Sequence, residues 1–406
     1  MEVLSWISNC IILFLLIFFA WPIVCYLIGL FSDLKRAPEA ESGKIAVLIC
    51  ARNEETVIGN LLESLARQDY PADRYQVFVA AHNCTDRTEE IARSHGATVL
   101  VRNEPAEKCK GAALRYAIGE IRTRYPGVFD TLCLFDADNV AGRDFLKEIN
   151  AALQNGADAA QGYRRSKNYH QNAVSELFGA YWHLVMIGQN LPHTLMGLPV
   201  TLSGTGFAVR MDAIGDTWNT FTMIEDIEFT CQLVLAGKKI VLAPHAVFYD
   251  EQPVDLRIAL RQRYRWAVGS YQVLKGYFFK LIRAIPRRGA AAFKMATELL
   301  INPVLLISFA AIVTQGVCIA INYGIPRMLL YFLILISVIW IYAQPLNVFL
   351  FIKERMNPLK NIATILFFPL FLSISFLFSV IPIFDRNPQW KPIPHSDTQT
   401  IETLEK

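Results

Sequence analysis

Four long apolar segments constrain the fold of this chain more than any other feature of its sequence. They cover approximately residues 7–31, 299–321, 328–351 and 362–384. Each has the roughly 20 residues that an α-helix needs to cross a bilayer. The 406-residue chain is also 53% hydrophobic and only 18% charged, which is too apolar for a wholly soluble protein. We therefore predict an N-terminal transmembrane anchor and, after a long middle region, three further transmembrane helices.

The basic residues around these segments predict the orientation of the chain. Lys35 and Arg36 follow the first segment, and further basic residues precede the second segment and separate the third from the fourth. The loop between the second and third segments contains a single basic residue, Arg327. By the positive-inside rule, the region from about 32 to 298 lies in the cytoplasm of a multi-pass protein of the cell membrane. The tail from Asp385 is then expected outside.

Charge and cysteine usage exclude several kinds of site. The net charge of +3 is too small to indicate a nucleic-acid partner. The eight cysteines contain no Cys-x-x-Cys pair, so neither a disulfide framework nor a zinc site is expected. Unpaired cysteines also suit a middle region that faces the reducing cytosol.

Strand-like and helix-like segments alternate through the first part of the middle region. Apolar strand patterns at 44–50, 76–81 and 131–135 are separated by helical patterns such as the apolar spacing within 56–68. This alternation predicts an α/β domain with a largely parallel sheet that is covered on both faces. Ligands of such sheets bind at the carboxyl ends of the strands.

Three polar segments follow predicted strands and are expected to meet at that edge. They are ARNEE at 51–55, HNCTD at 82–86 and DADN at 136–139. In an extended backbone Asp136 and Asp138 point the same way, and two adjacent carboxylates repel each other unless a cation balances them. Because carboxylates and diphosphate oxygens are preferred ligands of Mg²⁺ or Mn²⁺, we predict a metal site for a diphosphate. A solvated turn is the alternative explanation for Asp-x-Asp alone.

Two later segments add groups to the predicted pocket. The glycine-rich turn at 203–207 lets the backbone approach a ligand closely, although a plain tight turn explains it equally well. A helix is predicted to begin near Glu225 and to end at Gly237. Glu225, Asp226 and Glu228 crowd its first turn, and the helix dipole explains only one or two acids there. We favour Asp226 as a general base for a sugar hydroxyl over a purely capping role.

An arginine-rich helix is predicted over residues 256–273. Gln262, Arg265 and Trp266 stand at i, i+3 and i+4 and therefore share one face. An arginine there can bind phosphate through its forked donors, and an indole can stack on a sugar ring. The alternative is a basic helix on anionic lipid with Trp266 at the interface, and both can hold on different faces.

The ordered set of motifs resembles the membrane-integrated family 2 glycosyltransferases, which have a GT-A fold. The motifs ARNEE, NCTD, KG, DAD, GTGF, ED and QRYRW occur in that family's order over about residues 45–270. The last motif is similar to the Gln-x-x-Arg-Trp signature of processive cellulose, chitin and hyaluronan synthases. The expected domains are an anchor at 1–35, a cytoplasmic GT-A domain at 36–253, interfacial helices at 254–298, three transmembrane helices at 299–384 and a tail at 385–406.

The resemblance also implies roles for individual residues. The residues expected to bind the nucleotide sugar are Ala51, Arg52, Asn53, Glu54, His82, Lys110, Asp136, Asp138, Gln262 and Arg265. The residues expected to ligate Mg²⁺ or Mn²⁺ are Asp138 and Asp136. The expected catalytic pair is Asp226, as the base, and Glu225. The residues expected beside the acceptor are Gly204, Thr205, Gly206 and Trp266.

The implied reaction is a single inverting displacement. Asp226 takes the proton of the acceptor hydroxyl while the metal stabilises the departing UDP, so an α-linked donor gives a β-linkage. Two positions depart from the family pattern. His82 stands where an acid commonly reads uracil, which leaves the nucleotide base open, and Ile224 stands where Thr commonly precedes the Glu-Asp pair.

Three functions are consistent with these motifs. The first is processive synthesis of a β-linked polysaccharide, for which four spans would form a narrow pore unless a second copy or an accessory export subunit completes it. The second is transfer of a single sugar to a lipid acceptor, as in the ceramide glucosyltransferases. The third is a membrane-bound nucleotide-sugar sensor without turnover, which the intact metal and base residues disfavour.

Overall fold

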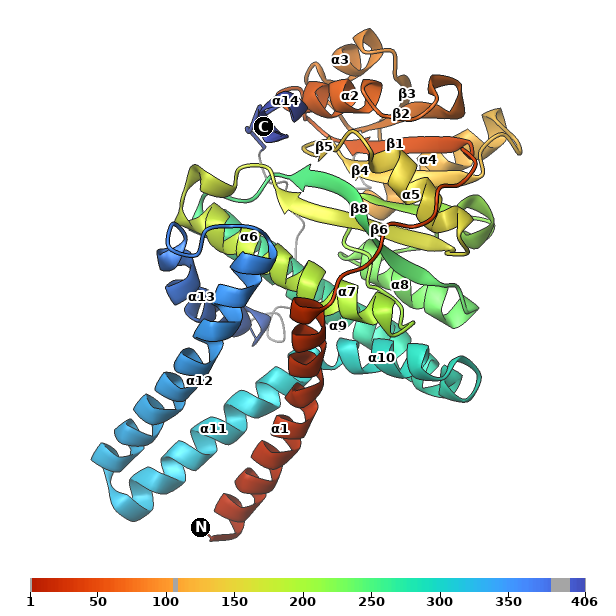
Figure 1. Ribbon diagram of the computed structural model, residues 1–406. Coiled ribbons are helices and arrows are strands. Elements are labelled where there is room, and N and C mark those ends of the chain that lie inside the picture. Colours follow the sequence, from red (N-terminus) through yellow and green to blue (C-terminus); the bar gives the residue numbers. More distant parts are fainter. Residues whose placement is uncertain (1, 105–108, 381–394, 406) are drawn as a thin grey trace.

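A computed structural model describes residues 2–104, 109–380 and 395–405, and it places an α/β domain on a set of long apolar helices (Figure 1). The strands are β1 (Ile45–Ala51), β2 (Tyr75–His82), β3 (Thr98–Arg102), β4 (Thr131–Asp136), β5 (Val140–Ala141), β6 (Ala159–Ser166), β7 (Phe207–Arg210) and β8 (Ile240–Asp250). The α-helices of this domain are α2 (Ile58–Ala66), α3 (Thr88–Ser94), α4 (Lys110–Arg124), α5 (Phe145–Gln154), α6 (Ala173–Val185), α7 (Leu191–Leu195) and α8 (Glu225–Ala236).

The strands form one sheet in the order β3-β2-β1-β4-β7-β6-β8-β5. The pairs among β3, β2, β1 and β4 are parallel, as the sequence pattern predicts, and β6 is parallel to β8. β7 instead runs antiparallel to both β4 and β6, and β5 runs antiparallel to β8. The prediction of a largely parallel sheet therefore holds for the first four strands, because only there do helices alternate regularly with strands.

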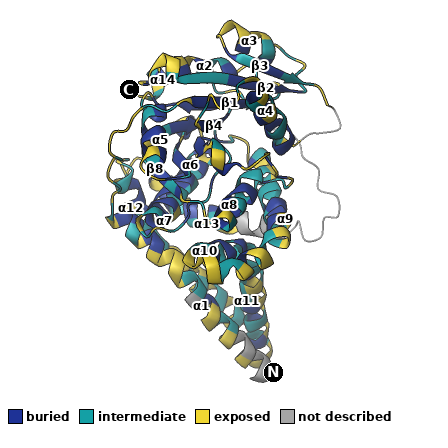
Figure 2. Cartoon of the chain, turned by 90° about the vertical axis from the view of Figure 1, so that its right-hand side faces the viewer, coloured by how far each residue is buried: buried dark blue, intermediate teal, exposed yellow. Residues whose placement is uncertain are grey.

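The side chains of β1 divide the interior into two layers. Ala46 and Leu48 belong to the apolar layer that includes residues of α4 and α8, whereas Ile45, Val47 and Ile49 belong to the layer that includes residues of α2 and α5. This alternation is the two-residue period of a strand that is buried on both faces. The buried strands and the exposed residues of the protruding helices are visible in Figure 2.

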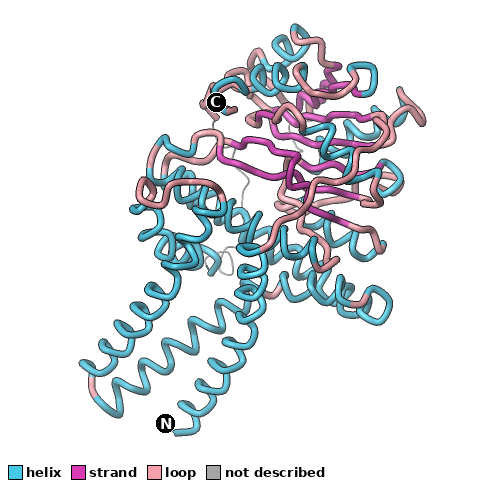
Figure 3. The backbone as a smooth tube through the Cα atoms, in the orientation of Figure 1, coloured by secondary structure: helices cyan, strands magenta, loops and turns pink. Residues whose placement is uncertain are grey.

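Long helices follow the α/β domain. They are α9 (Leu256–Arg288), α10 (Ala290–Leu299), α11 (Ile301–Tyr323), α12 (Ile325–Lys353) and α13 (Ile362–Val380), and α1 (Glu2–Phe31) precedes the domain. Within the described residues, three helices are long and apolar enough to cross a membrane: Asn9–Phe31 of α1, α11 and α12. These three protrude together from the α/β domain (Figure 3).

The described part of α13, Ile362–Val380, covers most of the fourth predicted span, and residues 381–384 of that segment lie outside the described residues. α13 packs against the α/β domain, where the rings of Phe371 and Phe178 on α6 lie 5.1 Å apart, centroid to centroid. One side of α13 therefore packs on protein, and its crossing of a membrane stays a prediction.

The tail also lies elsewhere than expected. Residues 385–394 are outside the described residues, but residues 395–405 contact the α/β domain and end in the short helix α14 (Ile401–Leu404). Ile401 is buried beside Val140 and Tyr249. The expectation that the tail lies across the membrane from the α/β domain is therefore wrong for residues 395–405. The count of basic residues predicts the side of each loop, but it carries no information on contacts between the tail and the folded domain.

Candidate functional site

A cavity of about 1000 Å³ opens at the carboxyl ends of β1, β2 and β4 and extends to α8, α9 and the start of α11. The predicted site residues that line it are Ala51, Arg52, Glu54, His82, Lys110, Asp136, Asp138, Gly204, Glu225, Asp226, Gln262, Arg265 and Trp266. Asn53, Thr205 and Gly206 are not among the lining residues. The structure thus brings together groups that are more than 200 positions apart in the chain.

Lys110 joins the two acidic parts of the cavity. Its Nζ lies 2.6 Å from Asp136 Oδ1 and 3.5 Å from Glu225 Oε1, and it donates to the Gly204 carbonyl oxygen at 2.6 Å. Burial by itself would lower the pKa of Lys110, but the charges of Asp136 and Glu225 raise it above its usual value. The ammonium therefore stays charged and forms ion pairs with both side chains.

The two aspartates of the DADN segment reach the cavity from different backbone positions. β4 ends at Asp136, and Ala137 and Asp138 form a turn, so strand alternation does not account for the orientation of Asp138. Asn139 shapes this turn by donating to Asp138 Oδ1 at 3.3 Å and to Asp250 Oδ1 at 2.8 Å. Asp138 is only 4% exposed. Burial raises the pKa of Asp138, and the charge of His395 opposes part of that rise.

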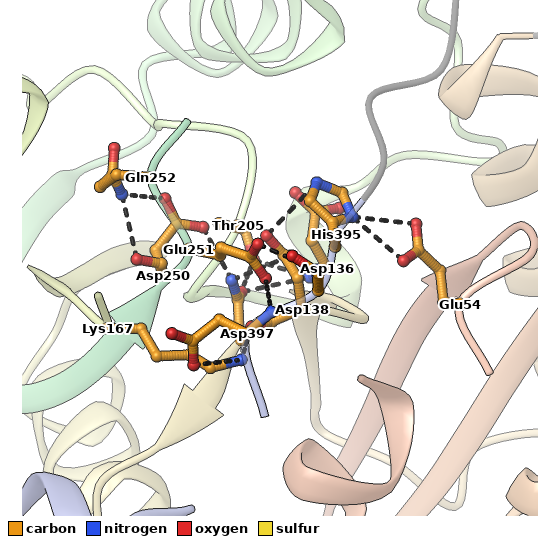
Figure 4. Close-up of polar contacts among 12 residues, drawn as sticks. Glu54, Asp136, Asp138, Lys167, Thr205, Asp250, Glu251, Gln252, His395 and Asp397 are labelled. Atoms are coloured by element: carbon orange, nitrogen blue, oxygen red, sulfur yellow. Dashed lines mark hydrogen bonds and ion pairs between the residues drawn. The ribbon is translucent and has the colours of Figure 1, made fainter. Parts of the chain in front are cut away.

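His395 of the tail lies between Glu54 and Asp138. Its Nδ1 is 3.0 Å from Glu54 Oε2, and its Nε2 is 3.6 Å from Asp138 Oδ2 (Figure 4). Burial would lower the pKa of His395, but Asp138 and Glu54 together raise it to about 10. The ring is therefore an imidazolium held between the carboxyl groups of Glu54 and Asp138.

Asp226 occupies the first turn of α8, opposite the glycine-rich turn. Its Oδ1 accepts the Ile227 N–H at 2.9 Å, and its Oδ2 would lie only 3.3 Å from a Cβ atom added at Gly204. Burial, and then the charge of Glu225, raise the pKa of Asp226 to about 7. A carboxylate with that pKa exchanges protons readily at neutral pH, as a general base must.

The other two acids in the first turn of α8 have partners of their own. Glu225 faces Lys110, as described above, and Glu228 accepts the N–H groups of Phe221 and Thr222, each at 2.8 Å. The predicted helix start at Glu225 and the stop at Gly237 are both confirmed, with Gly237 in the left-handed conformation at φ +77°. Local hydrogen bonding therefore explains Glu228, which leaves Asp226 facing the cavity.

The rest of the glycine-rich turn supports the aspartates. The Thr205 hydroxyl oxygen accepts the Asp136 N–H at 2.8 Å and is also hydrogen bonded to Asn139. Gly206 has φ +60°, and a Cβ atom there would lie 2.2 Å from the Phe248 ring. Thr205 and Gly206 therefore support the DADN turn from outside the cavity, whereas Ser203 and Gly204 of the glycine-rich turn line it.

The arginine-rich helix α9 forms the opposite wall. Gln262, Arg265 and Trp266 line the cavity together, as their spacing predicts. Among the described residues, Gln262 Oε1 and Arg265 Nε are buried without a hydrogen-bond partner. Trp266 stacks on Tyr181 with ring centroids 6.2 Å apart. Buried polar atoms of this kind are costly unless a ligand pairs with them.

Sequence reasoning missed several residues of the site. His395 was assigned to a tail outside the membrane. Arg164 of β6 lies 3.6 Å from Asp250 at the end of β8, and both line the cavity. No motif marks these positions, because the sheet order that joins β6 to β8 cannot be read from local patterns.

The cavity also suits a divalent cation in its chemistry. Asp138 and Asp136 provide carboxylate oxygens, the ligand type that Mg²⁺ and Mn²⁺ prefer. In the described parts of the chain, no three His, Cys, Asp or Glu side chains already form a cation cage. Asp136 forms an ion pair with Lys110. Phosphate oxygens of a bound donor would therefore be needed to complete the coordination of a cation.

Comparison with solved structures agrees with this architecture. The mannosyltransferase PcManGT from Pyrobaculum calidifontis, solved with GDP-Man and Mn²⁺, superposes with a TM-score of 0.63 over 95% of this chain and 100% of that chain. The sequence identity is 17%, so the similarity shows the fold alone. The predicted fold, a GT-A-like α/β domain with additional helices, is confirmed.

Comparison with curated proteins gives several glycosyltransferases. A probable glycosyltransferase of Bacillus subtilis, YdaM, is 29% identical over 268 residues, which are 60% of this chain and 60% of that protein. A beta-monoglucosyldiacylglycerol synthase of Synechocystis is 28% identical over 58% of this chain and 49% of that protein. A poly-beta-1,6-N-acetyl-D-glucosamine synthase of Staphylococcus aureus is 24% identical over 59% of this chain and 57% of that protein.

The chain thus spans about half to three-fifths of the length of these curated relatives. The family comparison covers the α/β domain and the first half of α9. Residues 42–269 match the family described as glycosyltransferase-like family 2, and this range contains every predicted site residue. The chain therefore belongs to the family 2 glycosyltransferases.

Proposed function

We propose that the protein transfers a sugar from a nucleotide sugar to a lipid acceptor that reaches the cavity from the membrane. One observation carries this proposal: the cavity that contains Asp138 and Asp226 is also lined by Leu305 of α11 and Leu372 of α13. Because α11 is a candidate membrane span, an acceptor with an apolar tail can reach the base without leaving the bilayer. The positive-inside rule would place this transfer at the cytoplasmic face of the cell membrane.

The donor would occupy the end of the cavity at the strands. Arg52, Glu54 and His82 line that end and would contact the nucleoside, with a UDP-sugar as the first donor to test. The unpartnered atoms of Gln262 and Arg265 would pair with diphosphate oxygens. Asp138 and Asp136 would hold Mg²⁺ or Mn²⁺, which when bound supplies charge stabilisation for the leaving diphosphate.

Asp226 would act on the acceptor. In this scheme its carboxylate accepts the proton of the acceptor hydroxyl, the hydroxyl oxygen forms a bond to the anomeric carbon, and the bond to the nucleoside diphosphate breaks on the opposite face. Such a displacement inverts the anomeric configuration, so an α-linked donor yields a β-linkage. Lys110 would engage Glu225 in an ion pair, which leaves the proton transfer to Asp226.

The relatives support a lipid acceptor without deciding it. The name of the Synechocystis relative specifies a glucosyl-diacylglycerol product, and its sequence similarity extends over more than half of this chain. An apolar acceptor also explains why Leu305 and Leu372 lie in the same cavity as charged donor-side residues. A soluble sugar acceptor would gain nothing from those side chains.

A second candidate is the synthesis of a β-linked polysaccharide. It is supported by the Gln262-x-x-Arg265-Trp266 face on the cavity wall and by the polysaccharide synthase among the relatives. In this scheme Trp266 would stack on the last sugar of the growing chain. Three candidate spans among the described helices make a narrow conduit, so export would need a second copy or another subunit.

The deciding experiment is a product analysis on protein purified in lipid nanodiscs. We would supply UDP-sugars and GDP-mannose with Mg²⁺ or Mn²⁺ and separate organic-extractable lipid from precipitable polymer before mass analysis. Product in the lipid fraction with one sugar per acceptor is expected. Long polymer in the precipitate would reject the lipid acceptor in favour of the second candidate.

Three variants accompany this assay. Asp138→Ala and Asp226→Asn should each abolish transfer. Asp216→Asn, which changes an exposed acid outside the cavity, should leave it unchanged. Donor binding without turnover in the unmodified protein would indicate a nucleotide-sugar sensor, and full activity of both site variants would overturn the assignment of the site.

A further inference from the structure

The end of the cavity nearest α10 and α11 contains a charge pair that the proposed transfer does not use. Lys294 and Glu298 stand one turn apart on α10, and Lys294 is only 6% exposed. Lys294 Nζ donates to Glu298 Oε2 and to Thr201 Oγ1, and the Thr201 hydroxyl donates to Glu298 at 2.8 Å from Oε1. α10 lies beyond residues 42–269, so the family match does not account for this pair.

The acidic side of this pair faces the cavity. Glu298 and Thr201 are among the described residues that line the cavity, and Lys294 is not. Burial by itself would raise the pKa of Glu298, but the charge of Lys294 holds it below its usual value, so the carboxylate stays ionised. An ionised carboxylate accepts hydrogen bonds and repels a phosphate. The part of a ligand that reaches Glu298 is therefore a neutral donor such as a hydroxyl.

The cavity wall between Glu298 and Asp226 presents a second polar group. This wall is the segment 201–204, which contacts Glu298 through Thr201 and faces Asp226 at Gly204. Ser203 lines the cavity, and within the described chain its hydroxyl oxygen is buried without a hydrogen-bond partner. A buried hydroxyl of this kind is costly unless a ligand pairs with it.

The same wall is tied to the helix that carries the proposed base. The Leu202 N–H donates to Thr230 Oγ1 at 3.1 Å, and that hydroxyl donates to the Asp226 carbonyl oxygen at 2.8 Å. The Cα atoms of residues 201 and 204 lie at most roughly 11 Å apart, because only three residues of chain join them. A sugar ring that is hydrogen bonded on opposite sides can span such a distance. The single free hydroxyl of a diacylglycerol cannot serve Asp226 and Glu298 together.

The lining changes from polar to apolar as the chain enters α11. Glu298, Asn302 and Leu305 line the cavity in this order, and the last two belong to α11, a candidate membrane span. At 1.5 Å per helical residue, the seven residues from Glu298 to Leu305 cover roughly 10 Å. A lipid whose tail lies beside Leu305 would therefore place its headgroup at Asn302 and Glu298.

We propose that Glu298 and Ser203 form a subsite for the hydroxyl groups of a sugar headgroup, so that the preferred acceptor is a lipid that already carries a neutral sugar. This inference rests on the lipid transfer proposed above and specifies its acceptor. One hydroxyl of the headgroup sugar gives its proton to Asp226, and its oxygen bonds to the anomeric carbon of the donor as the nucleoside diphosphate leaves. A second hydroxyl donates to Glu298, and a third pairs with Ser203.

The test compares acceptors for the full-length protein in nanodiscs, with the donor selected by the product analysis above. The lipid acceptors are glucosyl-dioleoylglycerol, dioleoylglycerol and dioleoylphosphatidic acid, and cellobiose is supplied from solution as a sugar without a lipid tail. The KM for glucosyl-dioleoylglycerol should be roughly tenfold lower than the KM for dioleoylglycerol, because the sugar adds hydrogen bonds to Glu298 and Ser203. Phosphatidic acid should accept no sugar, and cellobiose should have a higher KM than the glucosyl lipid.

Two variants remove the subsite in different ways. Ser203→Ala deletes the unpartnered hydroxyl and should raise the KM for glucosyl-dioleoylglycerol several-fold, with kcat and the KM for the donor unchanged. The double variant Lys294→Leu, Glu298→Leu removes the charge pair without leaving a lone buried charge, and it should bring the KM values of the two glycerolipids together. A merely structural role would change the KM for both glycerolipids alike.

A charge pair of the same spacing serves as the control. Glu120 and Arg124 form an i,i+4 ion pair on α4, and neither side chain lines the cavity among the described residues. The double variant Glu120→Gln, Arg124→Gln should leave the preference for glucosyl-dioleoylglycerol unchanged. Thermal unfolding of all variants would identify any loss of folded protein, and Ser203→Ala tests the inference by itself if the Lys294, Glu298 double variant does not fold.

Several outcomes would overturn the inference. Equal KM values for the two glycerolipids in the unmodified protein would reject the sugar subsite, while transfer to a lipid would stand. Transfer to phosphatidic acid would show that the acceptor end tolerates a phosphate. A lower KM for cellobiose than for the glucosyl lipid would show that the sugar is recognised without a lipid tail. The absence of transfer to every lipid would reject both this inference and the proposed function.

Discussion

Lys110 Nζ lies 2.6 Å from Asp136 Oδ1, so the first residue of α4 is joined to the last residue of β4 by a charged contact. The same ammonium lies 3.5 Å from Glu225 Oε1 on α8, which makes Lys110 a link between the end of β4 and the first turn of α8. A cation that balances both carboxylates also limits how far either can turn. The positions of Asp136 and Glu225 are therefore coupled through one side chain.

Replacing Lys110 should separate these effects. Lys110→Met keeps most of the side-chain volume but leaves two carboxylates without their counter-charge. Because Asp136 is 37% exposed and water screens the pair, we expect a loss of about 1 kcal/mol in the free energy of unfolding. We expect a much larger effect on kcat/KM, roughly a hundredfold decrease, because the charge faces the reacting groups.

The control is Lys147→Met, which removes an exposed ion pair with Asp69. It should change neither kcat/KM nor thermal stability measurably. Equal losses of activity in the two variants would show that the Lys110 charge has no special role in the cavity.

The rate of transfer should depend on the ionisation of Asp226. Burial and the neighbouring Glu225 raise the pKa of Asp226 to about 7, so below that pH the carboxyl is protonated and cannot accept a proton. We expect kcat to fall about tenfold per pH unit on the acid side of pH 7 and to level off above it. Asp226→Asn should show low activity without this acid limb.

The same pKa shift makes a prediction for stability. A carboxyl whose folded pKa is raised binds more protons in the folded state than in the unfolded state, so its contribution to stability falls as pH rises from about 3.8 through 7. At pH 8 the ionised Asp226 is therefore a cost to the fold. Asp226→Asn should melt at the same temperature as the unmodified protein or higher, which would show that its inactivity is chemical.

Two glycines of one turn should respond differently to alanine. At Gly206 the added Cβ would lie 2.2 Å from the Phe248 ring, so Gly206→Ala should lower the free energy of unfolding by about 1–3 kcal/mol. At Gly204 the nearest atom is Asp226 Oδ2 at 3.3 Å. Gly204→Ala should therefore lower kcat more than stability, because the base and not the core must shift.

A third glycine provides the control for this pair. Gly119 lies within α4 and has no atom within 4 Å of an added Cβ. Gly119→Ala should raise the free energy of unfolding by about 0.5 kcal/mol and leave activity unchanged. Thermal unfolding in nanodiscs, together with initial rates, would test all three substitutions.

Entry of the acceptor from the membrane can be tested at the apolar end of the cavity. Leu305→Trp should fill the space beside α11 and raise the KM for a lipid acceptor several-fold without changing the affinity for the donor. Leu330→Trp places the same side chain on an exposed position of α12 and serves as the control. A higher KM for the donor in Leu305→Trp would contradict the proposed division of the cavity.

The position of the tail predicts the topology of the chain. Because residues 395–405 contact the α/β domain, an epitope added after the last residue should be accessible from the same side of the membrane as that domain. Protease protection of sealed vesicles of both orientations would test this. Opposite protection of the epitope and the α/β domain would contradict the observed packing.

The parts of the site that follow local rules could be predicted from the sequence. The start of α8 at Glu225 and the shared face of Gln262, Arg265 and Trp266 depend on helical spacing and end signals, which are properties of neighbouring residues. Asp136 was correctly placed at the end of a strand. Asp138 reached the cavity for a different reason than expected, because a turn held by Asn139 replaces the extended backbone.

The remaining parts depend on contacts between distant segments. The short strand β7 runs antiparallel between β4 and β6, and no pattern in its four residues specifies that direction. α13 has the composition of a membrane span, yet its Phe371 packs on Phe178 of α6. His395 likewise lies in the site because of contacts with distant residues, Glu54 and Asp138. Composition records that a segment is apolar, but not whether lipid or protein covers it.

The contact between residues 395–405 and the edge of the sheet at β5 and β8 has a consequence for the order of biosynthesis. Residues 395–405 are the last of the described chain to leave the ribosome, and they follow every candidate membrane helix. Ile401 can therefore pack beside Val140 and Tyr249 only after α11 and α12 have been synthesised. Until then this edge of the sheet lacks that apolar contact, so the α/β domain completes its packing only once the candidate membrane helices exist.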